Sequence, residues 1–408
     1  MPIYVARQPI LDRGENLYGY ELLFRSSDEN RCPDIDGELA TSSLISNAIH
    51  YMKLDELVNH KRAFVNMTRE LLEREVYMVL PCENTVLELL ETVPVDEAVI
   101  KAFQQAKDAG YMVALDDVRS LQCPNELLAL ADIVKVDLME IDSERSGDIV
   151  KKVRDRSDAK LLAEKVETRE EFEAALALGY DYFQGFYFNK PEIIKGQRLA
   201  GIERSHLALL EEVNKPQLDM DAIEEVIKQD PSLTTNLLRF INSSVMGIRN
   251  KITSMKLALN LLGEKTIRKW SYVAVVGCLV KGKPSELLRM CMVRARFCER
   301  LAVGEQHDAE QLDLFLLGLG SLLEGIMNQP IADIVRQIDL PSPVVATLTN
   351  TNDAPFFYVT ALNLAKACEC GDWQEVIENT IALKQQQAEV AVAYYDSMNW
   401  ANQVMSGV

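Results

Sequence analysis

Polar and ionisable residues recur at the ends of short apolar runs in the first half of the chain. Each run is rich in β-branched or aromatic residues and ends on or near a group that can bind a cation, a proton or a phosphate. In order, these residues are Asn66, Glu88, Asp116 with Asp117, Lys135, Glu164 and Gln184. Carboxylate and amide oxygens suit a hard cation such as Mg²⁺ or Mn²⁺, and the absence of His from the set argues against zinc. Two such ions about 4 Å apart are a common device for displacement at a phosphodiester.

The apolar runs predict strands separated by helices. They cover residues 63–66, 85–88, 112–117, 133–137, 161–164 and 182–188. Helical patterns between them include 95–109, followed by Gly110, and 169–178, followed by Gly179. Repeated strand–helix alternation indicates a parallel sheet that is either doubly wound or closed into a barrel.

The phosphate-binding turn of a Rossmann fold is missing, which favours the barrel. No GxGxxG pattern follows the first strand. In a βα barrel the functional residues lie at the carboxyl ends of the strands, on one face. Asp116 and Asp117 would point to opposite faces if the strand ran through both, so both could bind metal only if the strand bends there.

Composition limits the classes of partner. The 408 residues carry a formal net charge of −19, which argues against sequence-independent binding of nucleic acid. No charged leader with an apolar run opens the sequence, and no stretch of about 18 apolar residues occurs, so we expect a cytoplasmic protein without a membrane span. Eight cysteines without a CxxC pair indicate reduced thiols.

At these motifs the sequence resembles the EAL family of cyclic di-GMP phosphodiesterases, whose fold is a TIM-like barrel. Residues 7–12 (RQPILD) and 19–25 (GYELLFR) are similar to the QPI segment and to the signature Glu-x-Leu followed by Arg. The other similar segments are 64–68, 87–91, 116–117, 134–137, 163–168 and 184–187. The resemblance covers residues 3 to about 191.

The resemblance implies a role for each site residue. The first metal would be held by Glu21, Asn66, Glu88 and Asp116, and the second by Asp117. Lys135 and Glu164 would position and deprotonate the attacking water, with Glu21 also counted as catalytic. Gln8, Arg25 and Gln184 would contact the substrate, and the guanidinium of Arg25 would meet a phosphate. The implied reaction is hydrolysis of cyclic di-GMP to the linear dinucleotide.

Two segments depart from the family pattern. Residues 118–124 replace a glycine-containing loop that Glu91 would brace, and an arginine at a position needing positive φ would be strained. Lys165 replaces a glycine beside Glu164, where its ammonium would either lower the pKa of Glu164 or crowd the substrate. Damage to supporting residues commonly lowers metal affinity or rate without abolishing a site, so we predict reduced activity.

The second half predicts an all-helical domain. Asp219, Asp230 before Pro231, and Thr253 or Ser254 are expected helix caps, and Gly263 is an expected stop. These patterns resemble the HDOD domain, a relative of HD-type phosphohydrolases without the metal dyad. Residues 318–322 (GLGSL) replace that dyad, and the pair at His307 and Asp308 is expected to be solvated or capping. The predicted domains are 1–195 and 201–408.

Three functions remain open at this point. The ligand set favours a working phosphodiesterase, whereas the altered loop and Lys165 favour a receptor or degenerate scaffold that signals through the helical half. A lyase of the enolase type would not account for Arg25. The resemblance also implies a homodimer and an unidentified protein partner for the helical domain.

Overall fold

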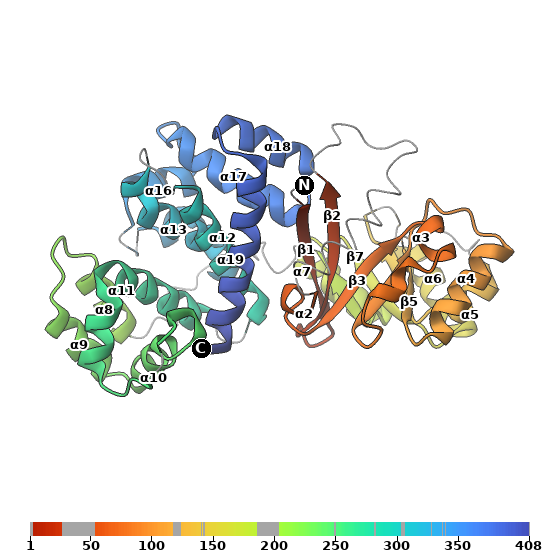
Figure 1. Ribbon diagram of the computed structural model, residues 1–408, viewed down its shortest axis with the longest axis horizontal. Coiled ribbons are helices and arrows are strands. Elements are labelled where there is room, and N and C mark those ends of the chain that lie inside the picture. Colours follow the sequence, from red (N-terminus) through yellow and green to blue (C-terminus); the bar gives the residue numbers. More distant parts are fainter. Residues whose placement is uncertain are drawn as a thin grey trace. The chain divides into compact units, whose positions relative to one another are not determined.

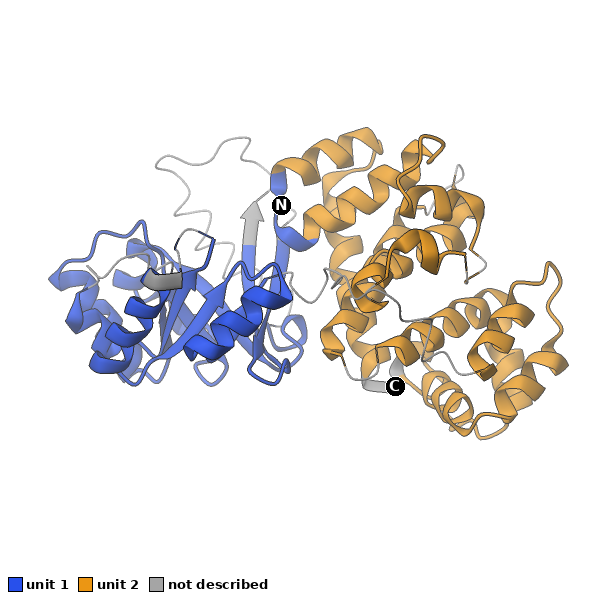
Figure 2. Ribbon diagram, turned by 180° about the vertical axis from the view of Figure 1, so that it is seen from behind, with its two compact units in different colours: residues 1–188, 369–373 blue, residues 189–368, 374–408 orange. Residues whose placement is uncertain are grey.

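The computed structural model describes residues 3–26, 54–116, 124–139, 141, 143–185, 204–248, 250–280, 283–302, 307–327, 329–336, 338 and 340–407. The chain divides into two compact units, Met1–Phe188 with Glu369–Trp373, and Asn189–Cys368 with Gln374–Val408 (Figure 2). Among the described residues, no helix combines the length and the apolar character needed to cross a membrane.

The first unit contains a closed barrel of eight strands, which confirms the predicted fold (Figure 1). The strands are β1 (Ile3–Asp12), β2 (Leu17–Ser26), β3 (Arg62–Met67), β4 (Thr85–Leu89), β5 (Met112–Leu115), β6 (Ile133–Asp137), β7 (Lys160–Glu164) and β8 (Tyr182–Gln184). Strands β2 to β8 pair in parallel with their neighbours, whereas β1 is antiparallel to both β2 and β8. The sequence patterns did not predict this first hairpin.

A side-chain cap fixes the turn between β1 and β2. The Oδ1 atom of Asp12 accepts hydrogen bonds from the backbone N–H groups of Gly14, at 2.8 Å, and Asn16, at 2.9 Å. Aspartate favours such turns because its short side chain can satisfy the backbone locally. The turn places Gln8 directly opposite Glu21 in the register of the hairpin.

Two predicted strands are too long. The strand predicted at 112–117 ends at Leu115, although the backbone N–H of Asp116 still donates to Leu89 of β4 at 3.0 Å. The strand predicted at 182–188 ends at Gln184, and Gly185 leaves the strand with φ of 149°. Asp117 and residues 186–188 lie outside the described part of the chain.

Helices alternate with the strands on the outer side of the barrel (Figure 1). They are α2 (Leu54–Leu57), α3 (Arg69–Glu73), α4 (Glu97–Asp108), α5 (Asn125–Leu130), α6 (Ser143–Arg156) and α7 (Arg169–Leu178), with a 3₁₀ turn at Val76–Val79. The helix predicted at 95–109 begins later because Asp96 caps it, accepting from the N–H of Val99. The helix predicted at 169–178 is confirmed: Thr168 and Glu171 form a capping box, and Gly179 ends it in the left-handed conformation.

The barrel interior has an apolar layer and a polar layer. The apolar layer includes Ile10, Phe64, Val86, Ala114, Ile133 and Leu162, with Tyr182 packed against it. Successive side chains of a strand alternate between its faces, so a residue two positions further on also points inward. Two positions after Phe64, Val86 and Ala114 come Asn66, Glu88 and Asp116. Ile133, Leu162 and Tyr182 are followed in the same way by Lys135, Glu164 and Gln184. The candidate site is therefore the polar layer directly above the barrel core.

Gly185 allows the end of β8 to approach the segment after β7. A Cβ atom at this position would lie 2.1 Å from the backbone oxygen of Val166, and the residue has φ of 149°. We expect Gly185→Ala to lower the free energy of unfolding by more than about 2 kcal/mol, because backbone must move and the conformation is strained. Gly179→Ala is the control, since φ is 100° there but nothing lies within 4 Å of the added atom. Equal losses in chemical denaturation would contradict this explanation.

The second unit is all-helical among its described residues. Its helices are α8 (Arg204–Val213), α9 (Met220–Lys228), α10 (Pro231–Ile241), α11 (Met255–Leu279), α12 (Ser285–Leu301), α13 (Gln311–Gly320), α14 (Leu323–Met327), α15 (Ile331–Ile334), α16 (Ser342–Leu348), α17 (Phe356–Cys370), α18 (Trp373–Ala382) and α19 (Gln387–Gly407). Two short 3₁₀ turns, η3 (Ser244–Met246) and η4 (Asp308–Glu310), join them.

The predicted caps are confirmed. Asp219 and Asp230 accept hydrogen bonds from the first turns of α9 and α10, and Ser254, rather than Thr253, caps α11. Gly263 interrupts α11 with φ of 71°, so the predicted stop is present although a second helical segment follows at once.

Candidate active site

Seven residues from seven strands meet at the carboxyl ends of β2 to β8. They are Glu21, Asn66, Glu88, Asp116, Lys135, Glu164 and Gln184. Gln8 joins them from the antiparallel strand β1 through a hydrogen bond from Gln184 Nε2 to its Oε1 at 2.8 Å. The structure therefore brings together eight of the residues selected from the sequence.

The Lys135 ammonium lies at the centre of four carboxylates. Its Nζ atom is 3.2 Å from Glu21, 3.1 Å from Glu88, 3.0 Å from Asp116 and 3.0 Å from Glu164. The Lys135 side chain is only 1% exposed and that of Glu88 is fully buried. One ammonium thus faces four acidic groups in a place that water barely reaches.

Glu21 also connects the amide side chains of the site. Its Oε1 accepts from Asn66 Nδ2 at 3.3 Å, and its Oε2 accepts from Gln184 Nε2 at 2.8 Å. Burial alone would raise the pKa of Glu21, but the Lys135 ammonium and these hydrogen bonds hold it below the ordinary value. Glu21 is therefore the carboxylate that this arrangement keeps ionised.

The pKa values of Glu88 and Glu164 shift in the opposite direction. Burial raises the pKa of Glu88 well above its ordinary value and that of Glu164 to about 7, although Lys135 opposes both shifts. Desolvation would lower the pKa of Lys135, but the surrounding carboxylates raise it well above the ordinary value. The site therefore carries more acidic groups than its single cation can compensate.

The donor set fits a hard divalent cation. Buried oxygens with neither a hydrogen bond nor an ion pair include Asn66 Oδ1 and Glu88 Oε2, whereas Glu88 Oε1 contacts the Lys135 ammonium. Buried polar atoms are normally paired, so unpaired oxygens beside excess acidic groups are what a cation would satisfy. Within the described ranges, no group of three Asp, Glu, His or Cys side chains is arranged to hold a metal ion, and the four carboxylates of the site contact Lys135.

Family models match both halves of the chain. The EAL domain model matches residues 3–191 and the HDOD domain model matches residues 199–322. The uncharacterized protein YuxH of Bacillus subtilis is 33% identical over 99% of this chain and 99% of its own length. The cyclic di-GMP phosphodiesterase CdgJ of Vibrio cholerae is 32% identical over 98% of this chain and 93% of its own length.

This chain belongs to the EAL/HDOD family. A solved structure of a standalone EAL protein from Vibrio cholerae O395, bound to c-di-GMP, is 26% identical with a TM-score of 0.38, and covers 47% of this chain and 92% of that chain. The two relatives extend over nearly the whole chain, beyond residue 322, where the HDOD match ends.

Of the three other residues selected from the sequence, one is outside the described residues, one has an undescribed side chain, and one lies in a turn. Asp117 lies outside the described residues, as do 118–123 of the altered loop. The backbone of Arg25 lies in β2 opposite Tyr4, and its side chain is outside the description. Glu91 is exposed in the turn after β4.

Lys165 occupies a conformation that suits glycine. Its φ of 53° is left-handed, which costs a residue with a Cβ atom roughly 1 kcal/mol. Its Nζ lies 2.5 Å from Oδ2 of Asp137, a side chain that is 1% exposed. The expected lowering of the pKa of Glu164 is wrong, since burial raises that pKa to about 7 and the Lys165 ammonium pairs with Asp137 instead.

Asp137 is a member of the site that had been assigned no role. It lies two positions after Lys135 in β6, so it shares the inward face of that strand, and it is opposite Glu164 in the register. The period of two residues along the strand could have identified it. Asp137 holds Lys165, and through it the segment that follows Glu164.

In the described part of the HDOD domain, no group of three Asp, Glu, His or Cys side chains could hold a metal ion. Where a metal dyad would lie, the Ser321 hydroxyl donates to the Gly318 carbonyl and accepts from Arg294. The ring of His307 stacks on Phe357 with centroids 3.9 Å apart, and its Nδ1 is 3.3 Å from Glu310. His307 makes local contacts there, and no metal pair with Asp308 is formed.

Proposed function

We propose that the EAL domain hydrolyses one phosphodiester bond of cyclic di-GMP in a reaction that depends on a divalent metal ion. The observation that carries the proposal is the convergence of four carboxylates and three amide side chains at one end of the barrel. A relative similar over almost the whole chain bears the name of a cyclic di-GMP phosphodiesterase. Hydrolysis of one of the two phosphodiester bonds gives the linear dinucleotide as product.

The metal would be Mg²⁺ or Mn²⁺, held by Glu21, Asn66, Glu88 and Asp116, with Asp117 serving a second ion. When bound, such ions polarise the phosphate and lower the pKa of water.

The other site residues act on water and substrate. Glu164 accepts a proton from the attacking water. Lys135 orients that water and compensates the negative charge of the surrounding carboxylates. Gln184 and Gln8 contact the substrate from the β8 and β1 side, and Arg25 meets a phosphate with paired N–H groups.

Reduced activity or a purely receptor role is the second candidate. The left-handed Lys165 and its ion pair with Asp137 favour it, because they alter the backbone directly after Glu164. In-line attack depends on geometry, and a displacement of about 1 Å can cost on the order of a hundredfold in rate. Binding tolerates such displacement better than hydrolysis does.

The deciding experiment follows the product. Purified protein is incubated with cyclic di-GMP and Mn²⁺, and the linear dinucleotide is measured by chromatography. A parallel calorimetric titration in Ca²⁺ measures binding alone. Slow formation of product is expected. Binding without product would establish the receptor, and neither binding nor product would leave the barrel as a scaffold.

Metal binding is tested by stability. Mn²⁺ or Mg²⁺ is expected to raise the melting temperature of the protein, because an ion that binds only the folded state stabilises it by mass action. Glu88→Gln should abolish this increase, since it removes a fully buried ligand. Glu83→Gln is the matched control, because Glu83 is exposed just before β4. An equal increase in the Glu88 variant would remove Glu88 from the metal site.

The HDOD domain is proposed to contact a protein partner, and two copies of the chain are proposed to form a homodimer. Ser321, which stands where a metal dyad would lie and is hydrogen-bonded to Gly318 and Arg294, supports a role of the HDOD domain without chemistry of its own. We propose that the EAL domain comprises residues 1–195 and the HDOD domain residues 201–408.

A further inference from the structure

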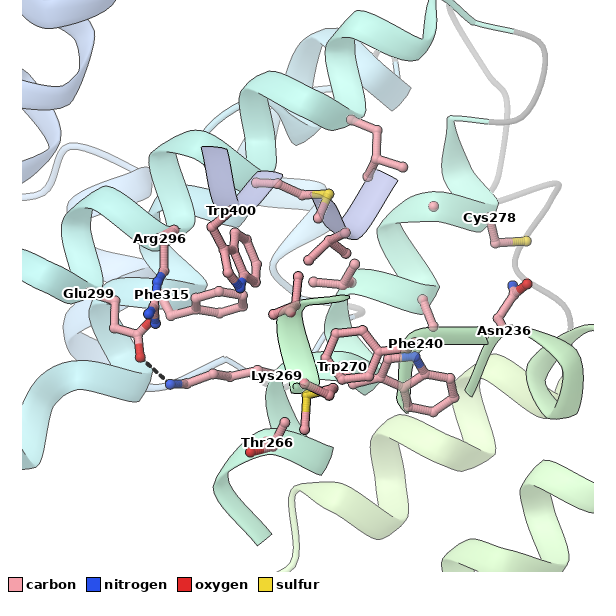
Figure 3. A pocket seen from close by; sticks show the side chains of 18 of the residues that line it. Asn236, Phe240, Thr266, Lys269, Trp270, Cys278, Arg296, Glu299, Phe315 and Trp400 are labelled. Carbon is pink, nitrogen blue, oxygen red and sulfur yellow. Dashed lines mark hydrogen bonds and ion pairs between the residues drawn. The ribbon is translucent and has the colours of Figure 1, made fainter. Parts of the chain in front are cut away.

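The helical domain contains a cavity to which the proposed function assigns no role. The cavity measures about 380 Å³ and is formed by α8, η3 and the helices α10 to α13 together with α19 (Figure 3). Sites for small organic ligands occupy roughly 300 to 1,000 Å³ and occur between helices of bundles. The volume is therefore sufficient for one small molecule.

Aromatic rings line this cavity from four helices. Phe240 of α10, Trp270 of α11, Phe315 of α13 and Trp400 of α19 all contribute (Figure 3). Phe315 and Trp400 meet edge to face with centroids 6.2 Å apart. Rings from separate helices offer flat and edge surfaces to a planar ligand.

Hydrogen-bond donors among the lining residues favour a ligand with polar atoms. Trp270 is only 4% exposed and lines the cavity, and its indole N–H is not among the fully buried polar atoms of the described residues that lack a partner. The indole of Trp400 and the amide of Asn236 also line the cavity and can donate hydrogen bonds to a ligand. An indole N–H can only donate a hydrogen bond. A ligand that satisfies these groups must carry acceptor atoms.

The charged residues of the cavity favour an anion. Lys269 and Arg296 share a single carboxylate, Glu299, which Arg296 Nη1 contacts at 2.8 Å and which also pairs with Lys269. Lys269 also lies over the Phe315 ring and Arg296 over the Trp400 ring, each at 5.6 Å. Two cations for one carboxylate leave a positive charge beside the aromatic rings.

We propose that this cavity is a binding site for a small aromatic acid, a planar ring system bearing one anionic group. The rings of Trp270 and Phe240 pack against the ligand ring, and Lys269 and Arg296 bind its anionic group. A bound ligand would contact both the first helix of the domain, α8, and the last, α19. The helical domain then senses a metabolite in addition to contacting a protein.

The test uses three probes on the full chain, measured by isothermal titration calorimetry. The compound 2-naphthoate carries both ring and anion, 2-naphthylmethylamine has the ring with a cation, and octanoate has the anion without a ring. We expect 2-naphthoate to bind at one site per chain, and the other two to bind at least about tenfold more weakly. Lack of 2-naphthoate binding, or equal binding of the amine, would overturn the proposal.

Two variants locate the site. Ala274 lines the cavity on α11, so Ala274→Leu fills it and should abolish binding, whereas Ala388→Leu on the exposed face of α19 should not. Lys269→Met should weaken binding about tenfold while Arg296 still neutralises Glu299, with the exposed Lys265→Met as control. Unchanged binding in a folded Ala274→Leu protein would place the ligand elsewhere. If that variant does not fold, unchanged binding in Lys269→Met would overturn the proposal.

Discussion

Replacing Glu21 by alanine is expected to lower the rate of cyclic di-GMP hydrolysis by at least about a thousandfold. The substitution removes a proposed metal ligand and, with it, the acceptor of hydrogen bonds from Asn66, Lys135 and Gln184. The site also lowers the pKa of Glu21, so this carboxyl stays ionised at the pH of the assay. The measurement is product formed per minute in Mn²⁺ at saturating substrate.

Two controls separate a chemical effect from loss of fold. Glu83→Ala removes the same charge from an exposed position before β4 and should retain full activity. A thermal melt of Glu21→Ala shows whether the barrel is still folded at the assay temperature. Activity within about tenfold of the parent in a folded Glu21→Ala protein would refute the proposed role.

Replacing Lys135 by methionine is expected to destabilise the metal-free barrel by about 3 to 5 kcal/mol. Methionine keeps the length of the side chain but leaves four acidic groups in a buried site without their shared cation. Lys101→Met, on the exposed side of α4, is the matched control and should change stability little. Unfolding in urea measures both.

The loss in the Lys135 variant should depend on pH and on metal. A buried carboxyl whose folded pKa lies above its unfolded value destabilises the fold when the pH exceeds the unfolded value. The penalty grows until the folded pKa is reached. The pKa values of Glu88 and Glu164 are already raised with Lys135 present. The loss of unfolding free energy in Lys135→Met should therefore become smaller as the pH falls from about 8 to about 5. It should also become smaller when Mn²⁺ is added at neutral pH. A deficit independent of both would mean that Lys135 acts through packing alone.

The polar layer of the barrel could be predicted because a strand has a short, fixed period. Once Phe64 points into the core, Asn66 must point inward too, and the same holds for Val86 and Glu88. The ends of predicted strands therefore identified residues that the closed sheet brings together. The first hairpin was missed although the local turn at Asp12 joins its strands, whereas the pairing of β1 with β8, which lies far along the chain, is not visible in any local pattern.

Features that depend on three-dimensional closure could not be predicted. The sequence shows a lysine in β6, but only the assembled ring places its ammonium within 3.2 Å of four carboxylates. Lys165 is left-handed next to Val166, whose backbone lies close to Gly185, and these segments meet only when β7 and β8 pair. The aromatic cavity depends on Trp400 packing beside Phe315, which no local pattern specifies.

The pairing of β1 with β8 also has a consequence for the order of events during synthesis. Gln8 and Gln184, which are hydrogen-bonded, are separated by 176 positions, so nearly the whole domain must leave the ribosome before this bond can form. Contacts between distant segments form slowly, and until then β1 has an unpaired edge that can join another chain. A chain whose synthesis ends before Tyr182 would lack β8. Its β1 strand would keep an unpaired edge, and Gln184 would be missing from the site.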